Sequence, residues 1–303
     1  MRRHVLAIIN LRKLKISGFT FIRNAIKYDY PVVESILSIL PICDELLVAV
    51  GRSNDNTLQL IRSIQSEKLR IIETEWDDSL REGGRVLAVE TDKAFQAISS
   101  DADWAFYIQA DEVLHEKYIE PVRNAILQYN DDSQVEGLLF DYLHFYGSYD
   151  YIGESFRWYR REIRIIRNRK DIFSYKDAQG FRKTPNDKLS VKLIPATIYH
   201  YGWVKDPRKM QRKQEDFIKF WKNDEGMEKN IARSDEFDYS KVDSLTPFVG
   251  EHPEVMKNRI NEKNWKFNYD IAYNHYTLKE KAKRLVMKLT GLRIGEYQNY
   301  KLL

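Results

Sequence analysis

Two acidic side chains directly follow an apolar run, in the segment Gln109-Ala110-Asp111-Glu112 after residues 104–108. The run predicts a buried strand, and carboxylates at its end must face a crevice or a cation, because burying them unpaired is costly. A divalent metal that bridges a carboxylate and a diphosphate meets this need, since it neutralises leaving-group charge and acts as a Lewis acid. The alternative is that Asp111 lies in a solvated loop or caps a following helix.

A second candidate ligand is His200, in the segment Tyr199-His200-Tyr201-Gly202-Trp203. It ends a predicted strand at residues 189–200, and an imidazole at a strand end can bind a metal ion. The alternative is a histidine packed among the neighbouring aromatic rings.

Residues 160–167 alternate in a way that predicts a strand with several arginines. The alternation puts Arg160 and Arg164 on one side of this strand and Arg161 and Arg167 on the other. Guanidinium groups bind phosphate oxygens well, so some of these arginines are candidates for a phosphate site. We expect most of them to be solvated or salt-bridged.

The elements that must position these groups alternate between strands and helices in the first half of the chain. This alternation predicts an α/β fold with a mostly parallel central sheet flanked by helices. Ligands of such sheets bind beyond the carboxyl ends of the strands, where the polar segments 51–57 and 109–112 fall. The predicted strands span residues 16–22, 45–50, 70–74 and 104–108, and the helices begin at Pro31, near Leu58 and after Gly84.

The second half of the chain is less regular, and residues 223–270 are polar without a clear period. We predict strands at residues 137–145, 162–167 and 189–200, and helices at residues 206–222 and 278–290.

Composition limits the partners and the compartment. The lone cysteine, Cys43, excludes an internal disulfide, and because it follows apolar residues we expect it to be buried and inert. The net charge is +4, and basic residues gather near the two ends, which argues against a nucleic-acid partner and suits an anionic membrane surface better. No apolar run is long enough for a spanning helix. We expect a cytoplasmic protein that could lie at the inner face of a membrane.

Three frequent motifs are absent: the dinucleotide-binding GxGxxG, the P-loop lysine motif and the GxSxG elbow. Dinucleotide oxidoreductases, P-loop NTPases and α/β-hydrolases are therefore disfavoured.

The order of the elements and their polar exits resembles glycosyltransferase family 2. The residues that carry the resemblance are Phe21-Ile22-Arg23-Asn24, then Ser53-Asn54-Asp55-Asn56-Thr57, then Gln109-Ala110-Asp111. The resemblance covers about residues 14–205 and rests on order and spacing together. It implies a GT-A catalytic domain at residues 14–222, after an N-terminal extension (1–13) and before a C-terminal helical extension (223–303).

The resemblance also implies a nucleoside-diphosphate sugar as donor and a divalent metal, Mn²⁺ or Mg²⁺. Asp111 matches the second aspartate of the family's D-x-D motif, and that aspartate resembles the metal ligand. In many GT-A enzymes a late histidine completes the metal shell, and His200 would take that place. The residues implied to bind the nucleotide sugar are Arg23, Asn24, Asp55, Gln109 and Asp111.

Two positions depart from the family pattern. The second strand ends in Val50-Gly51, where the family has an acidic residue that grips the base or ribose, and Gln109 replaces the first aspartate of D-x-D. The nucleotide must therefore be held differently, and Gln109 is a candidate for hydrogen bonding to the ribose.

The reaction implied is transfer of one sugar, with inversion, to a glycan or lipid-linked acceptor. Inversion needs a carboxylate that takes the acceptor's proton, which in related families lies on a loop between such a strand and the late histidine. Asp177 fits by position, and Asp141 and Glu154 are alternatives. A nucleotidyltransferase or a non-catalytic binding protein derived from a transferase remain alternative functions.

The predicted helix at residues 278–290 is basic and amphipathic, with Lys281 and Lys288 near Leu285 and Leu289. It could rest on an anionic membrane surface that carries a lipid-linked acceptor. The alternative is a helix packed on the domain.

Overall fold

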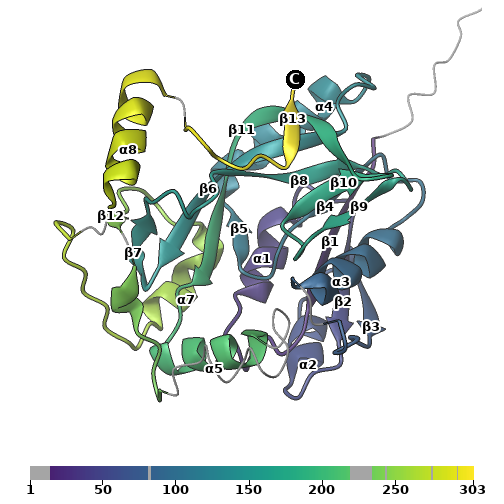
Figure 1. Ribbon diagram of the computed structural model, residues 1–303. Coiled ribbons are helices and arrows are strands. Elements are labelled where there is room, and N and C mark those ends of the chain that lie inside the picture. The colour runs from purple at the N-terminus through teal and green to yellow at the C-terminus, as the bar shows by residue number, and fades with distance from the viewer. Residues whose placement is uncertain (1–13, 81–82, 219–233, 243, 274–275, 292) are drawn as a thin grey trace, which may run out of the picture.

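The computed structural model of the chain describes residues 14–80, 83–218, 234–242, 244–273, 276–291 and 293–303. The predicted extension at residues 1–13 lies outside the described residues. Figure 1 shows a curled central sheet with helices on both faces. The predicted α/β fold is confirmed.

A parallel layer forms the first half of the sheet, in the order β3-β2-β1-β4. Strand β1 lies between β2 and β4 and pairs in parallel with both. Every residue of β2 is buried, as its near-continuous apolar sequence predicts. These strands are β1 (Ile16–Ile22), β2 (Glu45–Gly51), β3 (Leu69–Thr74) and β4 (Trp104–Tyr107).

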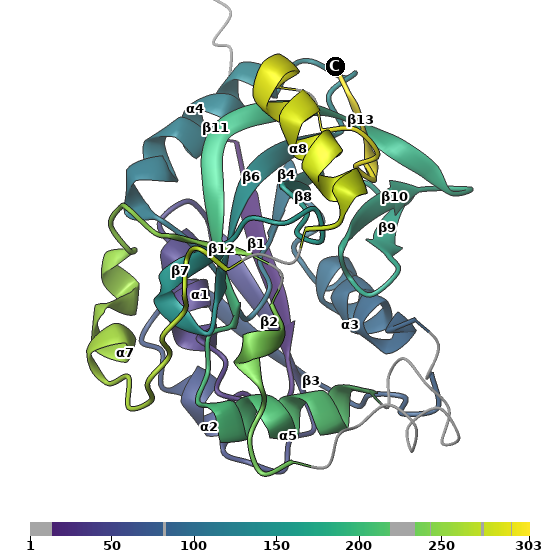
Figure 2. The ribbon, with the colours of Figure 1, turned by 60° about the vertical axis from the view of Figure 1, so that its left-hand side comes forward.

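Helices cover the two faces of this layer because successive strand residues point to opposite sides. Residues of α1 and α4 pack with Leu46 and Val48 on one face, whereas residues of α3 pack with Leu47 and Ala49 on the other. Figure 2 shows α1 and α3 on opposite sides of β1 and β2. The helices are α1 (Val32–Ile39), α2 (Thr57–Arg62), α3 (Arg85–Gln96) and α4 (Ile119–Tyr129).

The second half of the sheet mixes directions. Strand β8 runs antiparallel between β4 and β6, and β6 pairs in parallel with the long strand β11. The remaining strands are β5 (Glu112–Leu114), β6 (Gly137–Tyr146), β7 (Ser148–Gly153), β8 (Arg161–Arg167), β9 (Ile172–Tyr175), β10 (Gly180–Lys183), β11 (Asp187–Trp203), β12 (Leu245–Pro247) and β13 (Tyr300–Leu302).

The C-terminal part wraps back onto the domain, since β13 pairs with β11. The predicted helices at 206–222 and 278–290 appear as α5 and α8, and residues 219–222 of the first lie outside the described part. No described helix has the length and apolar character needed to cross a bilayer. These helices are α5 (Pro207–Phe217), α7 (Lys257–Asn261) and α8 (Leu278–Thr290), with 3₁₀ turns η1 (Glu116–Tyr118), η3 (Tyr239–Lys241) and η4 (Glu254–Met256).

The single cysteine is buried, as predicted. Burial raises the pKa of the Cys43 thiol to about 12, so the thiolate that reacts with oxidants or metals is scarce near neutral pH.

The carboxylate of Glu112 does not face a crevice, because it forms a buried ion pair with Arg164. The Nε and Nη2 atoms of Arg164 donate to the two oxygens of Glu112 at 2.8 and 2.7 Å, and both side chains are fully buried. Tyr142 donates a further hydrogen bond to Glu112, at 2.9 Å, and so does the backbone of Gln109, at 3.1 Å. The pair thus holds the segment after β4 against β8.

The other arginines of β8 and the residue before it have structural partners as well. Arg160 pairs with Glu296, Arg161 pairs with Asp141, and Arg167 donates to backbone carbonyls while lying 3.8 Å from the centre of the Trp104 ring. Arg160, Arg161 and Arg164 are therefore salt-bridged, as expected for most of these arginines, and Arg167 bonds to backbone carbonyls.

We predict that Arg164→Met lowers the free energy of unfolding by about 3–5 kcal/mol, because Glu112 would stay buried without a partner. Arg161→Met, on the same strand with a half-exposed partner, should cost about 1 kcal/mol or less. Denaturant titrations of the two variants make the comparison, and Arg164→Met with Glu112→Gln should recover part of the loss. Equal costs for the two single variants would contradict the role given to the buried pair.

Candidate functional site

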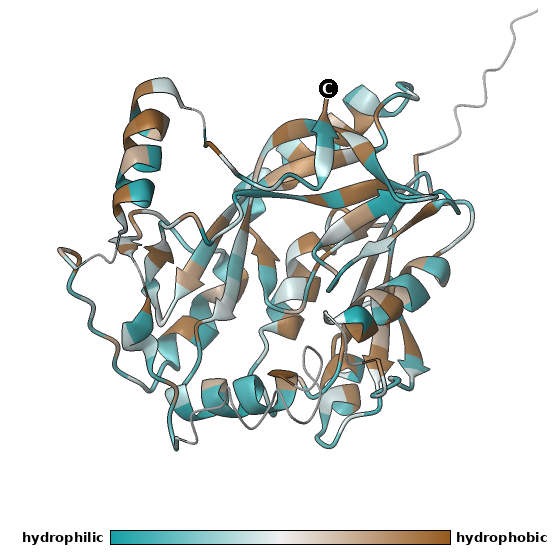
Figure 3. Ribbon diagram, in the orientation of Figure 1, coloured by the Kyte–Doolittle hydropathy of each residue, from teal (hydrophilic) through white to brown (hydrophobic). Residues whose placement is uncertain are grey.

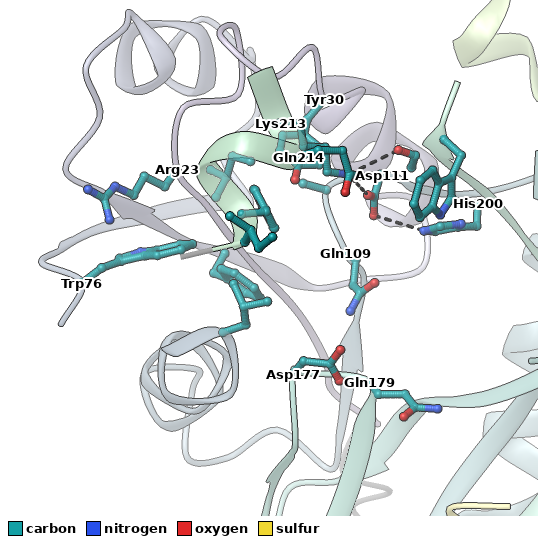
Figure 4. A pocket seen from close by; sticks show the side chains of 18 of the residues that line it. Arg23, Tyr30, Trp76, Gln109, Asp111, Asp177, Gln179, His200, Lys213 and Gln214 are labelled. Carbon is teal, nitrogen blue, oxygen red and sulfur yellow. Dashed lines mark hydrogen bonds and ion pairs between the residues drawn. The ribbon is translucent and has the colours of Figure 1, made fainter. Parts of the chain in front are cut away.

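A cavity of about 630 Å³ opens at the carboxyl ends of the parallel strands. Arg23 follows β1, Trp76 follows β3, and Gln109 and Asp111 follow β4; all four line it. Figure 4 shows Asp111 and His200 on one side of this cavity, Asp177 and Gln179 on another, and Gln109 between them. It lies where ligands of α/β sheets bind.

The structure brings together five of the predicted site residues. The cavity is lined by Arg23, Gln109, Asp111, Asp177 and His200, which come from four separate segments of the chain. The sequence contained these residue types, but only folding makes them neighbours.

Asn24 and Asp55 are not among the residues that line this cavity, contrary to the expectation that they touch the nucleotide. The Asn24 side chain accepts a hydrogen bond from the backbone of Asn54 at 2.7 Å, and Asp55 accepts from the backbones of Lys27 and Thr57 at 2.7 and 3.0 Å. Asn24 has a φ of 56°, which asparagine tolerates better than most residues. Both residues join the loop after β1 to the loop after β2.

Pairing of β5 with β11 brings Asp111 beside His200. His200 lies opposite Glu112 in this antiparallel pair, and the backbone of Tyr201 donates to the Asp111 carbonyl at 2.7 Å. The Asp111 Oδ1 atom is consequently 3.7 Å from His200 Nε2. Because β5 follows at once, Asp111 does not cap a helix.

Asp111 is a buried carboxylate in a positive environment. Its Oδ2 atom lies 3.6 Å from the Lys213 Nζ atom, and its side chain is largely buried. Burial opposes ionisation, but the positive charges of His200, when that imidazole is protonated, and of Lys213 and Lys205 outweigh it and lower the pKa of Asp111. The group is therefore ionised near neutral pH and able to bind a cation.

Hydrogen bonds assign the protons of His200. His144 lies beside it on β6, and the His144 Nε2 atom is 2.7 Å from the Tyr159 carbonyl, which can only accept, so this nitrogen carries a proton. Burial lowers the pKa of both imidazoles, although Asp111 opposes this at His200, and so favours their neutral forms. The His144 Nδ1 atom must then accept from His200 Nδ1, 3.1 Å away. This leaves a lone pair on His200 Nε2, facing Asp111.

A lone pair that faces a carboxylate suits a metal ion between them. The cradle is open because residue 202 is glycine: a Cβ there would lie 2.7 Å from both Asp111 Oδ2 and His200 Nε2. No group of three or more acidic, histidine or cysteine ligands occurs in the described part of the chain. Asp111 and His200 could supply two ligands to an ion such as Mn²⁺ or Mg²⁺, and the remaining ligands would have to come from substrate and water.

Asp177 sits at the tip of a strained turn between β9 and β10. Its two neighbours, Lys176 and Ala178, have φ values of 55° and 64°, in the left-handed region that side-chain-bearing residues seldom adopt. Burial raises the pKa of Asp177, which makes its carboxylate a stronger base. The strained backbone of this turn thus places a carboxylate with a raised pKa at the cavity.

Two side chains, Gln109 and Arg164, anchor this turn. The Gln109 Nε2 atom donates to the Ala178 carbonyl at 3.0 Å, and Arg164 donates to the Gln179 carbonyl at 2.9 Å. Gln109 therefore joins the Asp111 segment to the Asp177 turn.

The alternative bases lie elsewhere. Asp141 pairs with Arg161 and Glu154 pairs with Arg284, and neither is among the residues that line the cavity. Asp177 is the predicted base that the fold brings to the site.

Sequence reasoning missed Trp76 and Lys213. A Cβ at Gly51 would lie 2.3 Å from Trp76 Nε1, so glycine at this position makes room for the indole, over which the Arg23 guanidinium lies at 5.3 Å. Lys213 had no signal in the sequence, because charged helices such as α5 normally face solvent.

No family model and no curated protein matches this chain. Among solved structures it is similar to S. aureus TarS residues 1–349, with 12% identity, 73% of this chain and 67% of that chain covered, and a TM-score of 0.38. It spans 39% of a longer TarS structure.

Two other solved structures are similar to this chain at comparably low TM-scores. One is glucosyl-3-phosphoglycerate synthase from Mycobacterium tuberculosis with Mn²⁺, UDP and phosphoglyceric acid (20% identity, 44% of each chain, TM-score 0.28). Another is 4-diphosphocytidyl-2C-methyl-D-erythritol synthase from Anaerococcus prevotii (9%, 51% of this chain, 72% of that chain, 0.35). These similarities are too distant to assign a family or an activity.

We predict that His144→Leu moves the His200 proton from Nδ1 to Nε2, because Nδ1 loses its acceptor and Asp111 becomes the better one. His144→Asn, which keeps an acceptor, should preserve the wild-type form. Ring-nitrogen NMR of the metal-free protein distinguishes the two forms. The Leu variant should also bind Mn²⁺ about 10–100-fold more weakly. An unchanged His200 spectrum in His144→Leu would refute the proton assignment.

Proposed function

We propose that the protein is a glycosyltransferase that moves a sugar from a nucleoside-diphosphate donor to a glycan or lipid-linked acceptor. The observation that carries the proposal is the convergence, in one cavity, of an ionised Asp111, an imidazole lone pair on His200 and a separate basic carboxylate, Asp177. Asp111 and His200 would bind the diphosphate through a metal ion, and Asp177 would take the proton of the acceptor hydroxyl.

The donor is oriented by groups at both ends of the cavity. Trp76 and Phe21, with ring centres 5.7 Å apart, offer apolar surface for a base where the family's acidic residue is missing. Lys213 at the other end supplies a positive charge beside Asp111 for diphosphate oxygens. The base therefore lies toward β3 and the diphosphate toward β11.

Asp111 and His200 would hold Mn²⁺ or Mg²⁺ in the cradle opened by Gly202. When bound, the ion neutralises charge on the departing nucleoside diphosphate. Lys213 adds a further positive charge for this stabilisation without binding the ion itself. Its pKa is lowered by burial, and Asp111, 3.6 Å away, favours the charged form.

Asp177 acts from the opposite wall as the base. It takes the proton of the acceptor hydroxyl as that oxygen attacks the anomeric carbon, and the bond to the diphosphate breaks on the other side. Attack opposite to the leaving group inverts the configuration. The separation of Asp177 from the Asp111 side of the cavity supports this order of groups (Figure 4).

The first experiment is a screen of nucleotide sugars for hydrolysis and transfer with Mn²⁺. A glycosyltransferase releases nucleoside diphosphate from at least one donor. Release of pyrophosphate from a nucleoside triphosphate would instead identify a nucleotidyltransferase. Binding of nucleotide without turnover of any donor would identify a non-catalytic binding protein.

We predict that Asp111→Asn abolishes metal-dependent binding of the nucleoside diphosphate, because it removes the charge that holds the ion. Gly202→Ala should have the same effect without removing a ligand, since its Cβ occupies the cradle. Calorimetry with and without Mn²⁺ measures both variants, and Asp141→Asn is the control outside the cavity. Wild-type transfer that persists in excess EDTA would rule out the metal site.

We predict that Asp177→Asn reduces transfer by about 10²-fold or more while donor affinity stays within a few-fold, as expected of a group that acts only on the acceptor proton. Glu154→Gln and Asp141→Asn are matched controls, because both carboxylates lie outside the cavity lining. Steady-state transfer and donor binding are measured for all three. If Asp177→Asn transfers sugar at the wild-type rate, the base is a different residue.

A further inference from the structure

Helix α8 is defined by strong local signals at both ends. Thr277 and Glu280 form a reciprocal capping box, and Gly291 ends the helix with a φ of 72°. Yet none of its residues is buried. Isolated helices of this length are marginal in water, so a surface that packs against α8 would stabilise it.

The three leucines of α8 point away from the protein, whereas Val286 and Met287 are half-buried. Leu278, Leu285 and Leu289 are 86%, 59% and 75% exposed. Spacings of seven and four residues put these leucines in one stripe along the helix, together with the exposed Ala282. Figure 3 shows α8 at the edge of the molecule, with apolar bands along it.

The rest of the protein instead contacts the other side of α8, where Lys283 and Arg284 lie with the half-buried Val286 and Met287. Arg284 makes a salt bridge with Glu154 at 3.0 Å and lies 4.3 Å from the centre of the Tyr276 ring. Lys283 lies 5.5 Å from the centre of the Phe156 ring. A helix of a water-soluble domain normally has the reverse arrangement, with its apolar stripe on the core. Charged side chains therefore fix the helix so that its leucines face outward.

Lysines flank the exposed stripe. Lys281 and Lys288, seven residues apart, lie along one border, and both are exposed. Within the described part of the chain, neither forms an ion pair with an acidic side chain. An apolar stripe bordered by unpaired lysines complements a surface with hydrocarbon below and negative charge above.

We propose that this outward face of α8 docks on an anionic lipid bilayer, with the leucine stripe in the headgroup–acyl boundary and Lys281 and Lys288 against lipid phosphates. The charge of its border favours lipid over a second copy of the chain, whose α8 would bring the same lysines together. The proposal does not depend on sugar transfer, although it would bring the protein to a lipid-linked acceptor.

The test is flotation of the full chain, without nucleotide, with phosphatidylcholine vesicles that do or do not contain phosphatidylglycerol. Wild type should float with the anionic vesicles only. Leu285→Gln/Leu289→Gln should weaken this binding by about ten-fold or more, since glutamine preserves helix propensity but removes apolar area. Lys281→Gln/Lys288→Gln should remove the preference for anionic vesicles. Leu127→Gln, an equally exposed leucine on α4, is the control.

Three results would overturn the proposal: no flotation of the wild type, equal flotation of the leucine variant, or equal loss in the Leu127→Gln control. A concentration-dependent dimer in sedimentation, broken by the leucine variant in the absence of lipid binding, would assign the face to a second copy instead. Nucleotide binding should be the same in all variants, because α8 contributes no residue to the cavity lining. A failed glycosyltransferase assay would thus leave the lipid result standing.

Discussion

The buried pair of Glu112 and Arg164 is the contact on which the site depends. Both side chains are fully buried, so each charge offsets the desolvation cost of the other, and either one alone would be strongly destabilising. Glu112 is bonded to the backbone at Gln109, and Arg164 to the Gln179 carbonyl. One interaction therefore holds both walls of the cavity, the segment that carries Asp111 and the turn that carries Asp177. Of these two neighbouring carboxylates, Glu112 has a structural role and Asp111 faces the cavity.

The electrostatics of the cavity follow from this division. With Glu112 neutralised by Arg164, Asp111 is the carboxylate left between the His200 imidazole and the Lys213 ammonium. The His144 ring behind His200 then decides which nitrogen of His200 carries its proton. Such buried polar chains fix geometry because a buried donor or acceptor that loses its partner is costly. The strained turn at Asp177 has the same character, since its neighbours keep positive φ values only while surrounding contacts hold them.

Much of the fold was predictable from local patterns. The apolar runs gave β1, β2, β3 and β4 within a residue or two of their bounds, and α8 began and ended as predicted. The reason is that buried parallel strands and capped helices have periodicities and end signals that neighbouring residues carry by themselves. The sequence analysis missed the strands β5, β7, β9, β10, β12 and β13 and the helices α4 and α7. Three- or four-residue strands have too few residues to show a period.

The amino-acid sequence by itself determined which side chains are available at the strand ends, and hence Asp111, His200 and Asp177 as candidates. Only the tertiary structure decided their partners, because these depend on strand register: β5 against β11 puts His200 beside Asp111, and β6 against β11 puts His144 behind it. It also decided that Asn24 and Asp55 join loops, and that the leucines of α8 face outward. Periodicity reveals that a helix has an apolar side, but the direction of that side is set by distant contacts such as Arg284 with Glu154.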